Sequence, residues 1–307
     1  MPPSHFERFD KSFDRFILGT AHLDCLWTGA RWAEGPAYFA AQRSLVFSDI
    51  PNDRMMRYDE MSGTTTVFRT PANNTNGHTR DREGRLVSCE HLARRVTRTE
   101  HDGSITVIAD RFDGKRLNSP NDVVVHPDGA IWFTDPTYGI DMDYEGFKAT
   151  SEVGASHVYR VDPHTSLVEA VATDFVKPNG LAFTPDYSAL IVVDTGATHF
   201  EDGPRHMRKF TVGDDGKTLS GGDVFATSTE GLFDGFRFDE QGFIFTSAGD
   251  GVHCLNPEGE LIGKLRVPEV CANVAWGNGI KRNRLYICGT TSLYASYVNT
   301  RGMPYPT

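Results

Sequence analysis

The sequence predicts an all-β protein, and within that class a six-bladed β-propeller. Three observations support this prediction: a polar anchor residue recurs six times, most anchors precede a run typical of a β-hairpin, and no long stretch has the period of an α-helix. A blade of four short strands needs roughly 40–45 residues. A chain of 307 residues therefore has room for six blades and little else.

The anchors recur at a spacing that matches this blade length. They are Glu34, Asn76, Asn121, Asn179, Asp234 and Asn273, and successive anchors lie 42, 45, 58, 55 and 39 residues apart. The two longer intervals locate insertions at 136–155 and 195–206. Both insertions follow the second strand of their unit, so we expect them to cover the same face of the ring.

Strand pairs follow most anchors. The runs HPDGAIWFTD (126–135) and TPDYSALIVVD (184–194) are β-rich and contain a tight polar turn, which is typical of an antiparallel hairpin. A large β-sandwich is the alternative fold, but it would not require one anchor residue at six equivalent places. We expect the N-terminal segment, 1–30, to supply the strand that closes the last blade. The whole chain, 1–307, would then form a single domain.

Composition excludes several classes of partner. A formal charge of −10 and a pI near 5.5 argue against binding to nucleic acid or to an anionic membrane, both of which require a basic surface. The five cysteines include no C-x-x-C pair, which is typical of a reducing compartment. Neither a secretory signal nor an apolar run of about 18 residues is present. We therefore expect a cytoplasmic protein.

The anchors also predict a metal site. The first strand of each propeller blade lines the central channel, so equivalent anchors should converge there. Two carboxylates buried together repel each other unless one takes a proton or a cation lies between them. Carboxylate and amide oxygens suit Ca²⁺ best, with Mg²⁺ and Mn²⁺ as alternatives. Zn²⁺ is possible but prefers histidine or thiolate, and neither occurs among the anchors.

A simpler interpretation of the anchors remains open. Asn-Gly and Asp-Gly are the commonest hairpin turns, so each anchor could be only a turn residue. Glu34 does not fit this interpretation, because glutamate is a poor turn former. Asn121 and Asn179 follow prolines at the start of a strand, which also favours a common functional role.

Five segments around the anchors resemble a known family. They are AEGPAYF (33–39), NSPNDVVVHPDGAIWFTDPTYG (118–139), KPNGLAFTPD (177–186), FDGFRFDEQG (233–242) and NVAWGN (273–278). In these segments the chain resembles the gluconolactonase and regucalcin (senescence marker protein) family, in particular its bacterial gluconolactonase branch. The resemblance implies a calcium propeller in which Glu34, Asn179 and Asp234 bind the metal. It implies that Asn121 binds either the metal or the substrate, and that Asp234 is the general base.

Further residues are candidates for substrate binding. Asn76, Asn118 and Asn121 could hold a carbonyl and ring hydroxyls. The aromatic residues of the first insertion, Tyr138, Tyr144 and Phe147, could stack on a sugar ring or form a small core of the insertion itself. Asp135 ends a predicted strand next to this insertion and could bind a second ion or a substrate hydroxyl, or cap the following turn.

Three functions are consistent with these residues. The first is a lactonase, a carboxylic-ester hydrolase that opens a sugar or aldonic-acid lactone: the ion polarises the carbonyl and Asp234 takes a proton from the attacking water. The second is metal-dependent phosphotriester hydrolysis at the same ion. The third is a propeller that binds calcium or a sugar without turnover. The sequence leaves the sugar, the physiological ion and the oligomeric state open.

Overall fold

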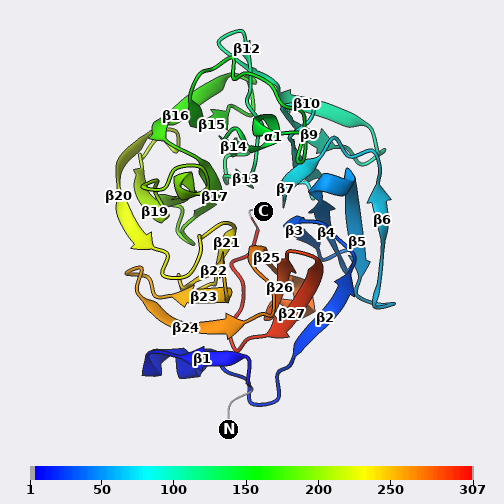
Figure 1. Ribbon diagram of the computed structural model, residues 1–307, viewed down its shortest axis with the longest axis vertical. Helices are drawn as coiled ribbons and strands as arrows, with labels where there is room; N and C mark the ends of the chain where they lie inside the picture. The colour runs from blue at the N-terminus through cyan, green and yellow to red at the C-terminus, as the bar shows by residue number, and fades with distance from the viewer. Residues whose placement is uncertain (1–3, 306–307) are drawn as a thin grey trace.

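The computed structural model describes residues 4–305 as a ring of six antiparallel sheets around a central channel (Figure 1). This confirms the predicted six-bladed β-propeller. In each blade the strands pair in chain order from the innermost strand outwards, and in two blades a strand from the N-terminal segment is added at the outer edge. The innermost strands β3, β7, β13, β17, β21 and β25 contact one another in that order, and β25 contacts β3 to complete the ring.

The first three blades are built entirely from consecutive strands. Blade 1 contains β3 (Ala33–Phe39), β4 (Ser44–Asp49), β5 (Arg54–Asp59) and β6 (Thr64–Arg69). Blade 2 contains β7 (Thr75–Arg80), β8 (Leu86–Glu90), β9 (Arg95–Thr99) and β10 (Ile105–Ala109). Blade 3 contains β13 (Val123–Val125), β14 (Ile131–Asp135), β15 (Ser156–Val161) and β16 (Val168–Phe175).

Blade 4 is also built from consecutive strands, whereas blades 5 and 6 each take an outer strand from the N-terminal segment. Blade 4 contains β17 (Pro178–Phe183), β18 (Ala189–Asp194), β19 (His206–Val212) and β20 (Leu219–Thr227). Blade 5 contains β21 (Phe236–Phe238), β22 (Ile244–Ala248), β23 (Gly251–Leu255) and β24 (Leu261–Arg266), with β1 (Phe6–Arg8) at its edge. Blade 6 contains β25 (Cys271–Trp276), β26 (Arg284–Gly289) and β27 (Ser292–Tyr297), with β2 (Leu23–Thr28) at its edge.

Short elements connect the blades. A small hairpin of β11 (Arg111–Phe112) and β12 (Lys115–Arg116) follows blade 2. The helical turns are η1 (Lys11–Phe16), η2 (Ile50–Asn52), α1 (Tyr138–Asp141), η3 (Gly196–Thr198) and η4 (Gly279–Lys281). Within residues 4–305, no helix has the length and hydropathy needed to cross a bilayer.

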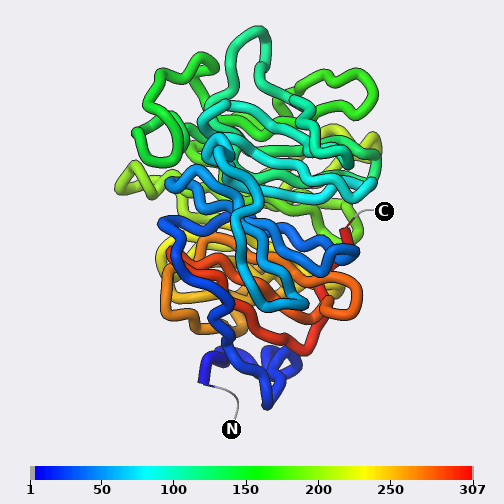
Figure 2. The backbone as a smooth tube through the Cα atoms, turned by 90° about the vertical axis from the view of Figure 1, so that its right-hand side faces the viewer, coloured from blue at the N-terminus to red at the C-terminus, as the bar shows by residue number. Residues whose placement is uncertain are grey.

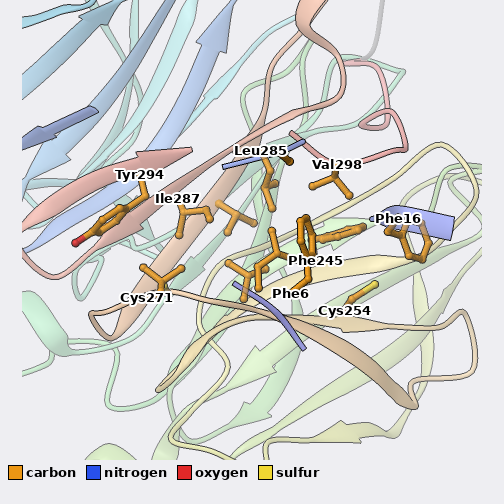
Figure 3. Close-up of a cluster of buried hydrophobic side chains, with 14 of the residues drawn as sticks. Phe6, Phe16, Phe245, Cys254, Cys271, Leu285, Ile287, Tyr294 and Val298 are labelled. Atoms are coloured by element: carbon orange, nitrogen blue, oxygen red, sulfur yellow. The ribbon is translucent and has the colours of Figure 1, made fainter. Parts of the chain in front are cut away.

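The N-terminal segment joins the two ends of the ring. β2 pairs antiparallel with β27, from Leu23 opposite Ser296 to Thr28 opposite Ser292. β1 pairs with β24 in the preceding blade, so the segment spans blades 5 and 6. Phe6 of β1 and Phe16 of η1 pack into the apolar cluster that blades 5 and 6 share (Figure 3). The segment therefore stabilises ring closure through backbone pairing and through apolar burial.

Each blade is apolar on both of its faces, because neighbouring blades cover them. The buried hydrophobic residues form six clusters, one between each pair of adjacent blades. β18 illustrates the consequence, since all six residues of its run ALIVVD are buried. Its sequence does not alternate because neither face meets water, which is typical of a strand buried on both sides.

The anchors lie at irregular points of the innermost strands. In blades 1, 2, 4 and 6 the pairing with the second strand shifts register at or next to the anchor, for example between Glu34 and Ala37. A β-bulge of this kind bends the strand and redirects its side chains. In blades 3 and 5 the anchor instead comes just before the first paired residue, Val123 or Phe236.

Glycine after an anchor lets the next blade come close. A Cβ atom at Gly77 would lie 2.5 Å from the carbonyl oxygen of Asn121, and the real backbone uses this space for a hydrogen bond of 2.7 Å from Gly77 N to that oxygen. A Cβ atom at Gly180 would overlap the carbonyl oxygen of Asp234. These glycines therefore let neighbouring innermost strands approach closely, and this brings the anchors of adjacent blades near one another.

The C-terminal segment up to residue 305 lies at the far end of the channel, near the centre of the ring in Figure 1 and on one face of it in Figure 2. Met303 N donates to Phe238 O at 3.0 Å, and Gly302 forms a bridge with Asp239. Residues 302–305 line a small apolar cavity there, together with Phe183 and Trp276. The anchors lie at the opposite ends of the innermost strands, so they face the other mouth.

The close approach of blades 2 and 3 can be tested with Gly77→Ala. Its methyl group would meet Asn121 O and the Cα of Asp122 at 2.5 and 2.7 Å, so the inner strands must move apart. We expect a loss of about 1–3 kcal/mol in the free energy of unfolding, the usual cost of overpacking. Chemical denaturation measures it. Gly19→Ala is the matched control, since nothing lies within 4 Å of its added Cβ; equal effects of the two changes would contradict this account.

Candidate functional site

Five of the six anchors meet in one cavity at the open end of the channel. Its volume is ≈ 380 Å³, and its lining includes Glu34, Asn76, Asn121, Asn179 and Asp234. Each belongs to a different blade, and each lies at or just before the innermost strand. The structure thus brings together the four residues predicted to bind metal and two of those predicted to bind substrate, Asn76 and Asn121. Tyr138, also predicted to bind substrate, lines the same cavity.

The sixth anchor, Asn273, lies behind this cavity and holds Glu34. Its Nδ2 atom donates to Glu34 Oε2 at 3.0 Å, and its Oδ1 atom accepts from the backbone N–H of Val274 at 2.8 Å. The backbone N–H of Gly35 donates to the same glutamate oxygen. Asn273 therefore positions a carboxylate rather than facing the channel.

The two channel carboxylates carry an electrostatic penalty. Burial, and then repulsion from Asp122, raises the pKa of Glu34. Burial in the channel wall, and then repulsion from Glu34, raises the pKa of Asp234 well above its usual range. Asp122 lies below them, where its own burial raises its pKa, and Arg237 Nη1 lies 3.7 Å from its carboxylate. The protein alone therefore favours protons on this pair at neutral pH.

The donor atoms of this cavity fit a hard cation. Within residues 4–305, no group of three or more His, Cys, Asp or Glu side chains is placed to hold a metal, so two carboxylates would have to act with amide oxygens. Asn121 and Asn179 supply such oxygens from neighbouring blades. Oxygen ligands of this kind suit Ca²⁺ or Mg²⁺, and they lack the nitrogen and sulfur that Zn²⁺ prefers.

Asn118 and Asp135 lie beneath the first insertion and do not line the cavity. The two oxygens of Asp135 accept the backbone N–H groups of Asn118 and Ser119, each at 2.8 Å. The Asn118 amide donates to the carbonyl oxygens of Asp135 and Ala155 at 3.0 and 2.8 Å. Its own oxygen accepts from Ser151 Oγ at 2.5 Å. These contacts hold the two ends of the insertion, and they leave Asn118 out of reach of a ligand in the cavity.

The two insertions form a lid over the same face, as the sequence predicts. We define the lid as residues 136–155 together with 195–206. Tyr138 OH lies 2.6 Å from Thr195 Oγ1 and 3.0 Å from Thr198 Oγ1, which joins the two parts. Lys177 Nζ donates to Asp141 Oδ2 at 2.6 Å and lies 4.9 Å from the centre of the Tyr138 ring. The lid is therefore tied to blade 4.

The lid aromatics differ in their surroundings. Tyr144 and Phe147 are 45% and 68% exposed, so they do not form a core within the lid. Neither belongs to the cavity lining, so they do not face a ligand there. Of the three aromatic residues, the structure leaves Tyr138 in the position expected for contact with a substrate.

Several cavity residues have no counterpart in the sequence prediction. The cavity is also lined by Trp32, Glu145, Thr195, Thr198, Leu232, Val270 and Cys271. Trp32, Leu232 and Val270 give the cavity an apolar part of its lining. Glu145 comes from the lid. The sequence marks it only as an acidic residue within the long insertion 136–155. The apolar residues lie in loops between anchors, and no repeat marks them.

Comparison with known proteins places the chain in a family. The sequence model of the family described as SMP-30/Gluconolactonase/LRE-like region matches residues 32–291. The chain belongs to this family. The matched region includes all six anchors and the whole lid, whereas β1 and β2 lie outside it.

Individual members of the SMP-30/gluconolactonase family show the same relationship. A gluconolactonase structure from Xanthomonas campestris is 36% identical with a TM-score of 0.88, covering 97% of this chain and 95% of that one. A gluconolactonase from Zymomonas mobilis is 26% identical over 279 residues, covering 83% of this chain and 75% of the relative. The calcium-binding protein regucalcin from Agrobacterium tumefaciens shares the fold at 20% identity and a TM-score of 0.73, with coverage of 92% and 96%.

The link between the two parts of the lid can be tested with Tyr138→Phe. Losing the hydroxyl should weaken the lid by about 1 kcal/mol, the usual net value of one hydrogen bond. This corresponds to roughly fivefold faster amide hydrogen exchange across 136–155 if the lid opens locally. Tyr144→Phe is the control, because Tyr144 has no side-chain hydrogen bond within residues 4–305. Equal exchange rates in the two variants would contradict the role given to Tyr138.

Proposed function

We propose that this protein hydrolyses a sugar or aldonic-acid lactone with the help of one divalent cation, Ca²⁺ being preferred. The observation that carries this proposal is the pair of carboxylates, Glu34 and Asp234, which line one cavity together with three amides at the end of the channel. The gluconolactonases named above act on such lactones, and the more similar of them matches 97% of this chain.

Four of the cavity residues would hold the cation: Glu34, Asn121, Asn179 and Asp234. When bound, a divalent cation supplies Lewis-acid chemistry, polarising the lactone carbonyl and lowering the pKa of bound water. Asn273 and the backbone N–H of Gly35 leave only one oxygen of Glu34 unengaged, so that carboxylate is oriented before any ligand arrives. Such support from a neighbouring side chain commonly strengthens metal binding.

The remaining residues would place the substrate and move protons. Two anchors carry a carboxylate, and Asp234 is half-buried whereas Glu34 is buried. Asp234 is therefore the more accessible to water, and we assign it to take the proton from the attacking water. The Asn76 amide, whose Nδ2 atom lies 3.3 Å from His91 Nε2, can bind a hydroxyl of the ring. Trp32 and Leu232 offer an apolar surface for the C–H face of the sugar.

A lactone suits this cavity in size and polarity. Its volume of ≈ 380 Å³ falls in the range of small-molecule sites. The lining combines amides and carboxylates with apolar side chains, which matches a ring that carries hydroxyl groups and C–H faces. Phosphotriester hydrolysis and binding without turnover remain the alternatives at the same residues, and the relatives named above favour lactone opening.

Removal of the cation should affect activity and stability together. A cation that joins blades 1, 3, 4 and 5 binds only the folded protein, so a chelator should abolish lactone hydrolysis and lower the melting temperature. At a cation concentration 100 times Kd, the lost stabilisation would be about 2.7 kcal/mol. Activity and thermal melts are compared in chelator and in chelator already saturated with Ca²⁺. An unchanged melting curve in excess chelator would contradict a cation in the channel.

The role of Asp234 as base is tested by Asp234→Asn at saturating cation. The amide keeps the shape and one oxygen, but it cannot take a proton, so turnover should fall by at least about 10²-fold. Cation binding is measured separately by calorimetry, so that weaker affinity is not mistaken for lost chemistry. Asp223→Asn is the control, because Asp223 is exposed on the outer strand β20. Full turnover by Asp234→Asn would leave Asp234 as a ligand and assign the base to water.

A further inference from the structure

The lid places a third carboxylate, Glu145, in the cavity. Glu145 lines the cavity together with Glu34 and Asp234, but it comes from above, from the insertion between β14 and β15. Its side chain keeps 24% of its surface open. Within residues 4–305 its carboxylate accepts no hydrogen bond, and its one close polar neighbour is His91 Nδ1 at 3.8 Å from Oε2. Glu145 is therefore a half-buried acidic group whose carboxylate accepts no hydrogen bond from residues 4–305.

Close packing fixes the position of Glu145. The next residue, Gly146, lies so near Gly139 that a Cβ atom would overlap the Gly139 carbonyl oxygen. Gly139 in turn lies directly over His91, since its own Cβ would come 2.5 Å from the His91 Cβ. The lid therefore rests on the wall of the cavity at this point, and Glu145 is held there before a ligand binds.

Glu145 is within electrostatic reach of both channel carboxylates. Its charge contributes to the raised pKa of Glu34 and to that of Asp234. It is not one of the anchors that would hold the cation, because it belongs to the lid and not to an innermost strand. A substrate bound at the anchors would thus lie between Asp234 on the channel side and Glu145 on the lid side.

We propose that Glu145 is the general acid of lactone opening, donating its proton to the ring oxygen as that oxygen leaves. This inference rests on the proposed function. Water attacks the carbonyl carbon and gives one proton to Asp234. The bond between the carbonyl carbon and the ring oxygen then breaks, and the proton of Glu145 moves to that oxygen to form the hydroxyl of the open acid. Glu145 regains a proton from solvent, and the proton on Asp234 is released.

The surroundings of Glu145 are consistent with a proton donor. Burial, and then repulsion from Asp141, raises the pKa of Glu145 to about 7. His91 also lies against Glu145; it is fully buried, and this burial lowers the pKa of the imidazole to about 4. His91 therefore adds no positive charge that would favour the carboxylate form. Two carboxyl groups in different environments can divide the roles of base and acid, as in other hydrolases.

The test compares two lactones whose ring oxygens differ as leaving groups. A poor leaving group needs a proton from a general acid, whereas a good one can leave without it. The ring oxygen of glucono-δ-lactone leaves as an alkoxide, which is a much stronger base and a poorer leaving group than a phenolate. The ring oxygen of dihydrocoumarin leaves as a phenolate, whose conjugate acid has a pKa of about 10. Glu145→Gln should lower kcat on glucono-δ-lactone by about 10²-fold. It should leave kcat on dihydrocoumarin nearly unchanged.

Controls separate this role from the others. Glu152→Gln changes a lid carboxylate outside the cavity, whose Oε2 accepts from Arg116 N, and should alter neither reaction. Thermal melts of Glu145→Gln should match the wild type, since no hydrogen bond to the carboxylate is lost. Equal loss on both lactones, or loss on neither, would overturn the role of Glu145 while leaving the lactonase intact. A wild-type protein that opens neither lactone would instead overturn the proposed function itself, and this inference with it.

Discussion

The close approach of six innermost strands around one axis is the constraint on which the rest of this structure depends. The ring closes only if neighbouring strands come within hydrogen-bonding distance at the channel wall. Glycine makes this possible at Gly77, where the backbone donates to Asn121 O, and at Gly235, where it donates to Ala272 O. The same closeness places the anchor side chains together, so the site is a direct consequence of how the blades pack. Bulges at several anchors then turn those side chains toward the mouth of the channel.

This packing has an electrostatic consequence. Glu34 and Asp234 are brought close in the wall of the channel, and burial together with repulsion from neighbouring carboxylates raises the pKa of both carboxyl groups. A cation would relieve this repulsion, so a site that is costly without a ligand becomes favourable with one. Two nearby groups offset part of this repulsion: Arg237 lies near Asp122, and the Asn273 amide donates to Glu34. The carboxylates themselves are left open to the cavity.

The lid adds chemistry that the ring cannot supply. A ring of equivalent strands offers similar positions around one axis, whereas the insertions after β14 and β18 bring groups from above. Contacts such as those of Tyr138 with Thr195, and of Lys177 with Asp141, hold the lid in one place. A carboxyl group on the lid meets different neighbours from one in the channel, and different neighbours are what allow two carboxyl groups to take opposite roles in proton transfer.

The sequence by itself determined the repeat, the number of blades and the anchors, because each blade must meet the same requirements at the channel and so repeats the same residues. Five anchors line the cavity as that repeat implies. Only the tertiary structure decided which polar residues face a ligand. The sequence makes Asn118 a candidate for substrate binding, yet its amide group is hydrogen-bonded to Asp135, Ala155 and Ser151. Glu145 and Trp32 lie outside any repeat, and they reach the cavity because of the path that the loops take over the ring. Such contacts join residues far apart in the chain, so no local pattern records them.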